Sequence, residues 1–204
     1  MVIYSNIDLK EFKTHADNGD LLLFRSKWYS TKFQRTVTRS NYDHVGMLVL
    51  CETDDDVNTL FLLEAVSDEG VRLVEFLPNV QAYFDVYDKV VYRPIQNLDR
   101  DENMLNELDN YLEEVLGKKY GFAFSKFWRN SINLKGANGK HIWDANRTFQ
   151  CAELIAKMYK VLGLFSPEEN SGKYIPAHFT EKRQIELLKG EFGPECTLYI
   201  PKDP

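Results

Sequence analysis

Residues 146–162, reading NRTFQCAELIAKMYKVL, are the stretch on which the predicted fold depends. Apolar residues recur in it at spacings of three and four, as on one face of an α-helix; they are Cys151, Leu154, Ile155, Met158 and Leu162. Either Asn146 or Thr148 can serve as the N-cap, so we expect Cys151 in or near the first turn. Unpaired amides and the helix dipole favour a nucleophilic thiolate there. The alternative is that Cys151 is a small buried hydrophobic residue.

The composition is ordinary for a globular protein, with 204 residues, 44% hydrophobic and 27% charged. This length fits one domain over residues 1–204. The net charge of −6 argues against a nucleic-acid partner, which normally requires a basic surface. No stretch approaches the roughly 20 apolar residues of a membrane helix, and the first residues do not resemble a secretory signal. We therefore expect a cytoplasmic protein. The sequence gives no indication of its oligomeric state.

Three cysteines, at positions 51, 151 and 196, form neither a disulfide framework nor a metal-ligand spacing. The histidines outside the predicted site, His15, His141 and His178, are scattered along the chain and share no such spacing either. No metal or organic cofactor is therefore implied.

Strands come mainly in the first half of the chain and helices mainly in the second. The predicted strands are 21–24, 44–51, 60–66, 71–76, 89–93 and 197–200, and the predicted helices are 8–16, 99–116 (ended by Gly117), 146–162 and 179–189. The acidic turn between 44–51 and 60–66 indicates a hairpin. Because strand–helix–strand units are few, this order predicts an α+β domain built on an antiparallel sheet.

The predicted hairpin carries two residues with possible chemistry. His44 opens the first strand, where it is either a catalytic base or a polar residue at the sheet edge. Gly46 follows it, and a glycine inside a strand suggests close approach of another backbone or a ligand. Glu64 lies inside the run LFLLEAV, where an unpaired buried carboxylate costs several kcal/mol. Glu64 therefore needs a partner or an altered pKa, and the candidates are His44 across the hairpin and Arg72.

These residues fit the pattern of an activated nucleophile. Cys151 would attack, His44 would hold its proton, and Glu64 would orient the imidazole and stabilise its charged form. The backbone amide of Cys151, at the expected helix start, would face the developing oxyanion.

Several short motifs occur in an order that resembles the circularly permuted papain-like amidases of the YiiX/YaeF type, relatives of the NlpC-like cell-wall peptidases. The motifs are GDLL at 19–22, HVG at 44–46, GKKYGF at 117–122 and QCAEL at 150–154. The resemblance covers nearly the whole chain. It implies that Cys151, His44 and Glu64 are catalytic and that Tyr120 lines the substrate site, although Tyr120 can equally be a core residue.

The resemblance also implies a permuted papain-like fold, with an antiparallel, partly barrel-like sheet packed on helices. By this resemblance, the expected substrate is a peptide, another amide or an acyl lipid. The lecithin:retinol acyltransferase branch carries Asn-Cys-Glu-His at its nucleophile, whereas residues 150–153 read Gln-Cys-Ala-Glu. This difference makes an acyltransferase a less favoured interpretation without excluding it. Permuted proteases that remove ubiquitin-like proteins share the order of His before Cys, so this class is a further alternative. A catalytically silent binding module of the same fold is the alternative from another class.

Overall fold

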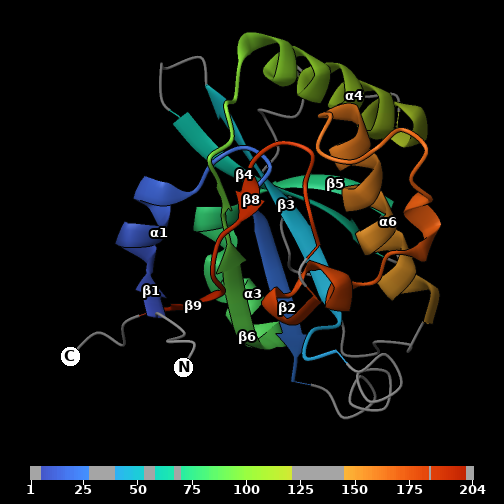
Figure 1. Ribbon diagram of the computed structural model, residues 1–204. Helices are drawn as coiled ribbons and strands as arrows, with labels where there is room; N and C mark the ends of the chain where they lie inside the picture. Colours follow the sequence, from blue (N-terminus) through green and yellow to red (C-terminus); the bar gives the residue numbers. More distant parts are fainter. Residues whose placement is uncertain are drawn as a thin grey trace.

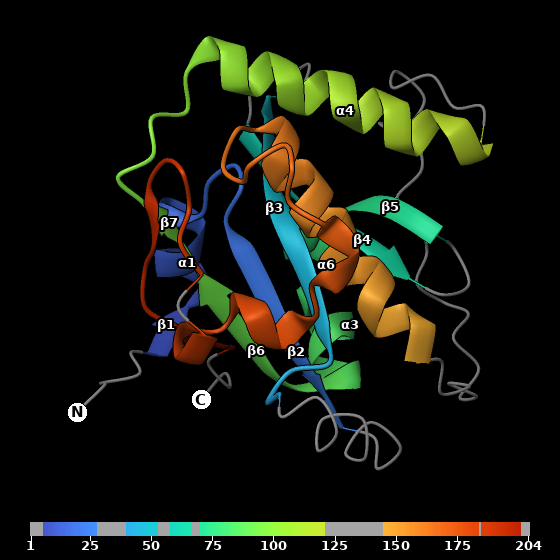
Figure 2. The same cartoon turned by 45° about the vertical axis from the view of Figure 1, so that its right-hand side comes forward.

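A seven-stranded sheet with helices on both faces forms the body of the molecule in this computed structural model (Figures 1 and 2), which describes residues 6–27, 40–52, 58–66, 70–120, 145–183 and 185–200. Its strands are β1 (Asn6–Asp8), β2 (Leu21–Ser26), β3 (His44–Glu52), β4 (Asn58–Val66), β5 (Gly70–Glu75), β6 (Tyr87–Arg93) and β9 (Cys196–Tyr199). A two-stranded sheet pairs β7 (Ile95–Gln96) with β8 (Glu191–Phe192). The predicted α+β class is confirmed.

The strand order of the large sheet is β1-β9-β6-β2-β3-β4-β5. Neighbouring strands are antiparallel except β1 and β9, which run parallel, so the prediction of a wholly antiparallel sheet is wrong at this edge. The prediction of a partly closed barrel is also wrong for the described residues. Closure would require β1 to pair with β5, and these strands lie at opposite ends of the order.

The helices are α1 (Leu9–His15), α3 (Phe76–Val86), α4 (Glu102–Tyr120) and α6 (Ala145–Val161), followed by the 3₁₀ turns η1 (Ser171–Lys173), η2 (Pro176–Phe179) and η3 (Glu181–Arg183). Successive strand residues point to opposite faces of the sheet. Val45 and Met47 therefore join the core beneath α4 and α6. Leu48 joins the core on the other face, with Phe12 of α1 and Phe76 of α3.

Two predicted helix boundaries and one predicted helix are wrong. Helix α4 continues past Gly117 to Tyr120, because glycine weakens a helix without always ending it. Helix α6 begins at Ala145, before both expected N-caps. The helix predicted at 179–189 is replaced by η2, η3 and irregular chain, and the amide of Leu188 donates to the carbonyl of Leu164 instead of to a helical partner. Helix α1, with Asp8 as its N-cap, agrees with the prediction.

The turn before β2 is tied to the rest of the fold by the buried side chain of Asp20, which is 1% exposed. Its Oδ1 accepts from the amide of Ile95 at 2.8 Å and from Nη2 of Arg100 at 2.9 Å. Its Oδ2 accepts from the hydroxyl of Tyr92 at 2.6 Å. Burial raises the pKa of Asp20 from 3.8 to about 6, against the opposing effect of these donors. We call these residues the Asp20 cluster.

Helix α6 is anchored to the same turn. The hydroxyl of Tyr159 donates to the carbonyl of Gly19 at 2.7 Å, and Tyr159 is fully buried. Because Tyr159 lies two helical turns after Cys151, this bond helps to fix where the helix places the cysteine along the sheet.

Candidate active site

The β3–β4 hairpin brings His44 and Glu64 into contact. Met47 is paired with Leu63, which places the start of β3 beside the end of β4. The imidazole Nε2 of His44 lies 2.6 Å from Oε2 of Glu64, and each side chain is 1% exposed. His44 is therefore a buried residue of the sheet and not a polar residue at its edge.

The second oxygen of Glu64 is held by the neighbouring elements. Oε1 accepts from Nε of Arg72 at 2.8 Å, from Nη2 of Arg72 at 2.6 Å and from the hydroxyl of Tyr83 on α3 at 2.8 Å. Both partners considered from the sequence, His44 and Arg72, are thus present together. Burial acts to raise the pKa of Glu64, but His44 and Arg72 outweigh it and lower the pKa to about 2. Glu64 is therefore an ionised carboxylate at neutral pH.

Cys151 reaches the same imidazole from α6, the helix that packs on β3 and β4. Burial acts to lower the pKa of His44, but the neighbouring Cys151 and Glu64 outweigh it and raise the pKa to about 9. The Nδ1 atom of His44 is buried and makes no hydrogen bond of ordinary geometry with the residues described. The thiol of Cys151 lies beside the imidazole, since both a hydrogen bond from Cys151 and the charge of its thiolate form act to raise the pKa of His44.

The position of Cys151 in its helix corrects two expectations. Since α6 begins at Ala145, Cys151 is in the second turn and not in the first. The effect of the helix dipole is confined to the first turn, so the dipole is a minor influence on this thiol. Only the first four amides of a helix lack an intrahelical partner, so the amide of Cys151 does not serve as the expected oxyanion donor.

Aromatic rings enclose the imidazole. The ring of Tyr87 lies almost parallel to it, at an interplanar angle of 7° and a centroid distance of 6.2 Å. The ring of Phe24, which is paired with His44 across β2 and β3, lies at 5.4 Å. Tyr83 stacks on Phe24 at 5.5 Å while its hydroxyl bonds Glu64. The rings fix the plane of the imidazole and keep the ion pair in a medium of low polarity.

Gly46 has a structural explanation. A Cβ atom at this position would lie 2.7 Å from Cδ1 of Leu62 and 3.1 Å from the carbonyl oxygen of Leu63. The close approach expected from the sequence is therefore that of the adjacent strand.

Sequence reasoning missed Tyr83 altogether. It lies on α3, which was not predicted because Pro78 interrupts its sequence and because several of its residues are aromatic or β-branched. The alternation of strand residues offered a signal for Arg72, since Arg72 is paired with Glu64 on the neighbouring strand. The side chain of Tyr120 lies outside the described part of the chain, so its expected role is not tested.

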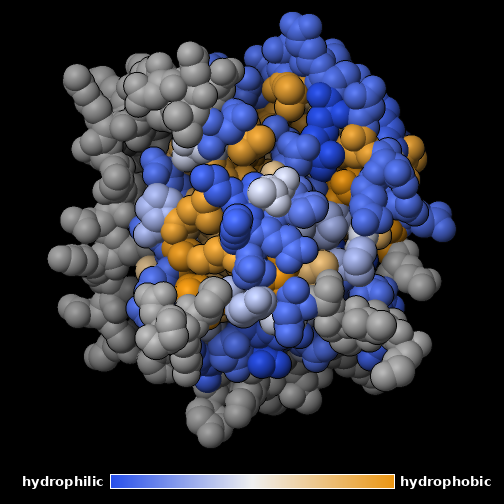
Figure 3. Space-filling model, turned by 90° about the vertical axis from the view of Figure 1, so that its left-hand side faces the viewer, coloured by the Kyte–Doolittle hydropathy of each residue, from blue (hydrophilic) through white to orange (hydrophobic). Residues whose placement is uncertain are grey.

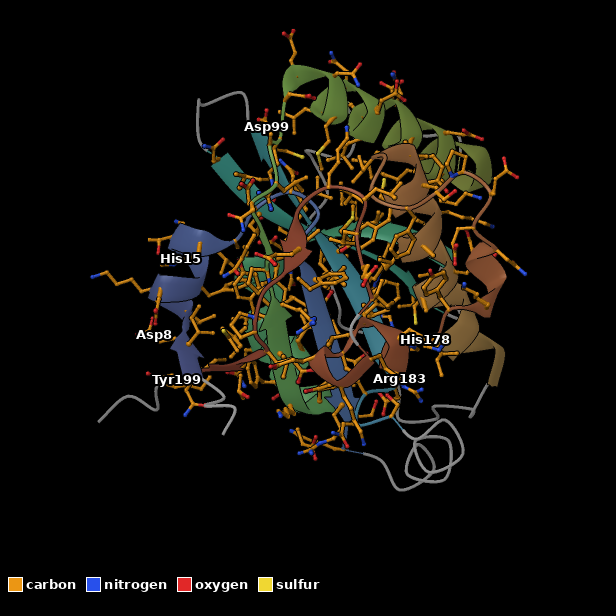
Figure 4. All side chains as sticks on the ribbon, viewed as in Figure 1. Asp8, His15, Asp99, His178, Arg183 and Tyr199 are labelled. Carbon is orange, nitrogen blue, oxygen red and sulfur yellow. The ribbon has the colours of Figure 1, made fainter. Side chains whose placement is uncertain are left out.

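The remaining cysteines and histidines of the described residues do not join this site. Burial raises the pKa of Cys51 to about 11, which makes it a poor nucleophile at neutral pH. His15 and His178 lie at opposite sides of the molecule (Figure 4). No group of three or more His, Cys, Asp and Glu residues among those described is arranged to hold a metal ion.

A hollow of about 500 Å³ opens beside α1, and none of His44, Glu64 and Cys151 lines it. Its walls come from α1, the facing ends of β3 and β4, and the start of α3; they include Lys13, Asp17, Leu50, Asn58, Glu75 and Leu77. Figure 3 views the molecule from the side that carries α1, where hydrophilic residues surround smaller apolar areas. The hollow is thus separate from the cysteine and its partners.

No protein-family model and no curated protein sequence matches the chain. Among solved structures, the chain is similar to the crystal structure of the metalloprotein YiiX from Escherichia coli O157:H7, a DUF1105 protein. The match has a TM-score of 0.46 and 18% identity, and it covers 91% of this chain and 97% of that one. YiiX is of the type that the sequence motifs resemble. At this level of similarity the match transfers no residue role to this chain.

Proposed function

We propose that the chain is a cysteine-dependent hydrolase of the permuted papain-like type, most directly an amidase or peptidase. The observation that carries the proposal is the buried arrangement of Cys151, His44 and Glu64. A thiol faces an imidazole whose other nitrogen is held at 2.6 Å by an ionised carboxylate, which is the arrangement of an activated nucleophile.

The residues have distinct roles in the proposed reaction. His44 accepts the proton of Cys151, and the thiolate sulfur forms a bond to the carbonyl carbon of the substrate. When the tetrahedral intermediate collapses, the bond to the leaving group breaks and the imidazolium gives its proton to that group. His44 then removes a proton from water, and the resulting hydroxide attacks the carbonyl carbon of the acyl-enzyme. The carbon–sulfur bond breaks, the imidazolium returns its proton to the sulfur, and the carboxylic acid is released. Glu64 stays ionised throughout and stabilises the imidazolium.

Access to the sulfur requires movement, because Cys151 is fully buried. A substrate carbonyl must come within about 3–3.5 Å of the sulfur before attack. Opening of the covering side chains therefore precedes each turnover, and we expect large substrates and reagents to react more slowly than small ones.

The competing function is a catalytically silent binding module. The complete burial of Cys151 favours it, whereas the engaged His44 favours an enzyme. Acyl transfer to an acceptor other than water, with a lipid or peptide acyl donor, is a variant of the proposed chemistry. An added amine that diverts the acyl group from water would distinguish transfer from hydrolysis. In the described residues no helix is long and apolar enough to cross a membrane.

The deciding experiment is the pH dependence of Cys151 alkylation by iodoacetamide in wild type and in His44→Ala, read by mass spectrometry. We expect wild type to be labelled fast below pH 7. A free thiol with a pKa near 8.5 is about 1% ionised at pH 6.5, so His44→Ala should react about 100-fold more slowly there. Cys51 in the same chain serves as an internal control, since its pKa of about 11 predicts slow labelling in both proteins.

Identical alkylation profiles with midpoints near the free-thiol value, in both proteins, would overturn the hydrolase proposal in favour of a silent module. If the profiles differ as expected, fluorogenic amides, thioesters and esters come next. Release of product by wild type and its loss in Cys151→Ala would then establish hydrolysis.

A further inference from the structure

Arg72 and Tyr83 hold the third member of the triad from outside it. We propose that they are positioning residues, which keep Glu64 ionised and direct its Oε2 atom towards His44. This inference rests on the proposed function and extends it to two residues that do not touch the reacting atoms.

The two carboxylate oxygens of Glu64 have different hydrogen-bond partners. Oε1 accepts three hydrogen bonds, two from Arg72 and one from Tyr83, all between 2.6 and 2.8 Å. Oε2 faces His44 at 2.6 Å. Because three donors on two elements, β5 and α3, fix one oxygen, the carboxylate cannot rotate without breaking all of them, and Oε2 remains directed at the imidazole.

Charge balance explains why the holding residue is a cation. With Cys151 neutral, His44 neutral, Glu64 ionised and Arg72 protonated, these four groups sum to zero charge. After the proton moves from the sulfur to the imidazole, the same four groups again sum to zero. A buried site that keeps its net charge avoids the cost of an uncompensated charge, which is several kcal/mol. The side chain of Arg72 is only 13% exposed, so water screens its charge weakly.

Tyr83 contributes a donor that stays protonated. Burial, followed by the neighbouring Glu64, raises the pKa of its hydroxyl far above the ordinary value. Its ring is packed between Phe24 at 5.5 Å and Phe76 at 5.4 Å, and Tyr87 lies behind it at 6.4 Å. The ring therefore keeps the hydroxyl in place without help from water.

Loss of Arg72 has a specific chemical consequence. The Glu64 carboxylate would lose one of the two partners that offset burial, and its pKa would rise. A protonated Glu64 would donate to Nε2 of His44, which forces the imidazole proton onto Nδ1. An imidazole protonated at Nδ1 cannot accept the proton of Cys151, so the thiol would lose its base.

The Asp20 cluster supplies matched controls within the same chain. Arg100 pairs with a carboxylate that is 1% exposed, and its own side chain is 16% exposed, close to the values of the Glu64–Arg72 pair. Tyr92 donates to Asp20 as Tyr83 does to Glu64. Arg100→Met and Tyr92→Phe thus break equivalent buried bonds away from the cysteine.

The experiment measures the alkylation rate of Cys151 by iodoacetamide against pH in wild type, Arg72→Met, Arg72→Lys and Tyr83→Phe, with Arg100→Met and Tyr92→Phe as controls. Circular dichroism establishes that each variant is folded. For Arg72→Met we expect at least a tenfold slower rate at pH 6.5, because the midpoint of the alkylation profile should rise by one pH unit or more. Arg72→Lys should recover part of this loss, since it restores the charge without the paired donors. For Tyr83→Phe we expect about a threefold slower rate, since half a pKa unit corresponds to that factor.

A folded Arg72→Met with the wild-type midpoint, or controls that shift the midpoint as far as the site variants do, would overturn the inference. If Arg72→Met does not fold, the inference is tested by Tyr83→Phe. An unchanged alkylation midpoint in that variant would also overturn it. Failure of the proposed function has a different signature, because the wild-type midpoint would then itself lie near the free-thiol value and would not respond to His44→Ala.

Discussion

Glu64 and Asp20 are two buried carboxylates that share the same kinds of partner. Each is 1% exposed, and each accepts hydrogen bonds from one arginine and one tyrosine. Their remaining partners differ. Glu64 bonds to the imidazole of His44, whereas Asp20 bonds to the backbone amides of Ile95 and Asp17.

The difference reverses the direction of their pKa shifts. Burial acts to raise both values. In Glu64 the two cations His44 and Arg72 outweigh burial, and the pKa falls to about 2. In Asp20 the single cation Arg100 and the amides do not outweigh it, and the pKa rises to about 6. One additional buried cation thus separates a carboxylate suited to support proton transfer from one that holds strands together.

The largest expected effect is on catalysis. Glu64→Gln removes the charge that stabilises the His44 imidazolium, and we expect kcat/KM for an amide or ester substrate to fall about 10³-fold, within the range for general acid–base groups. Asp20→Asn should change kcat/KM less than threefold, because distant sites act independently. Steady-state kinetics with both folded variants test this contrast. Equal losses in the two variants would show that the clusters are not functionally distinct.

The second prediction concerns stability against pH. Folded Asp20 binds its proton more tightly than the unfolded chain, so between about pH 4 and pH 6 its contribution to stability is lost as the pH rises. Relative to Asp20→Asn, wild type should therefore gain on the order of 3 kcal/mol when the pH falls from 7 to 4. The contribution of Glu64 to stability depends on pH in the opposite direction. It is present above the unfolded pKa of Glu64 and is lost as the pH falls towards 2. Urea unfolding of wild type and both variants measures these slopes. A flat difference between wild type and Asp20→Asn would contradict the raised pKa.

A third comparison uses the glycine beside each cluster. In Gly46→Ala the new methyl group would meet the side chain of Leu62 and the backbone of Leu63, and we expect a loss of about 2–3 kcal/mol, as for other overpacked cores. In Gly19→Ala the nearest atom is 3.6 Å away, so the cost is that of the left-handed backbone with φ of 89°, about 1–2 kcal/mol. Thermal and urea unfolding should rank the two in this order. The reverse order would mean that β4 yields easily to the added methyl group.

The smallest effect is expected for Tyr159→Phe, which removes the hydrogen bond between α6 and the turn before Asp20. One such bond contributes about 1 kcal/mol. The unfolding midpoint should fall accordingly, while the alkylation midpoint of Cys151 stays unchanged because the packing of the ring persists. A shifted alkylation midpoint would show that the two clusters are coupled through α6.

Local sequence patterns predicted those parts of the fold that depend on neighbouring residues. The aliphatic runs of β3 and β4 and the acidic turn between them indicated the hairpin, and the apolar stripe of residues 146–162 indicated α6. The charged residue inside LFLLEAV correctly indicated that Glu64 needs partners, because burial of a charge is costly wherever it occurs.

Features that depend on distant segments escaped prediction. β1 has only three residues and pairs with a strand near the other end of the chain, so no local pattern marks it. Tyr83 finds Glu64 only because α3 folds over the sheet, and the sequence of α3 gives a weak helical signal. Asp20 follows a glycine and could be recognised as part of a turn, but three of its four donors, on Tyr92, Ile95 and Arg100, come from residues that only the fold assembles.

The parallel pairing of β1 with β9 also bears on synthesis at the ribosome. β9 lies between β1 and β6, so β1 has no neighbour in the sheet until residues 196–199 have been made. At about 5–20 residues per second, the first strand waits roughly 10–40 s for its partner. In the later part of that interval, once residues 87–93 have been made, β6 presents an unpaired edge for roughly 5–20 s, and another nascent chain can bind it. The emergence of the last strand closes that edge.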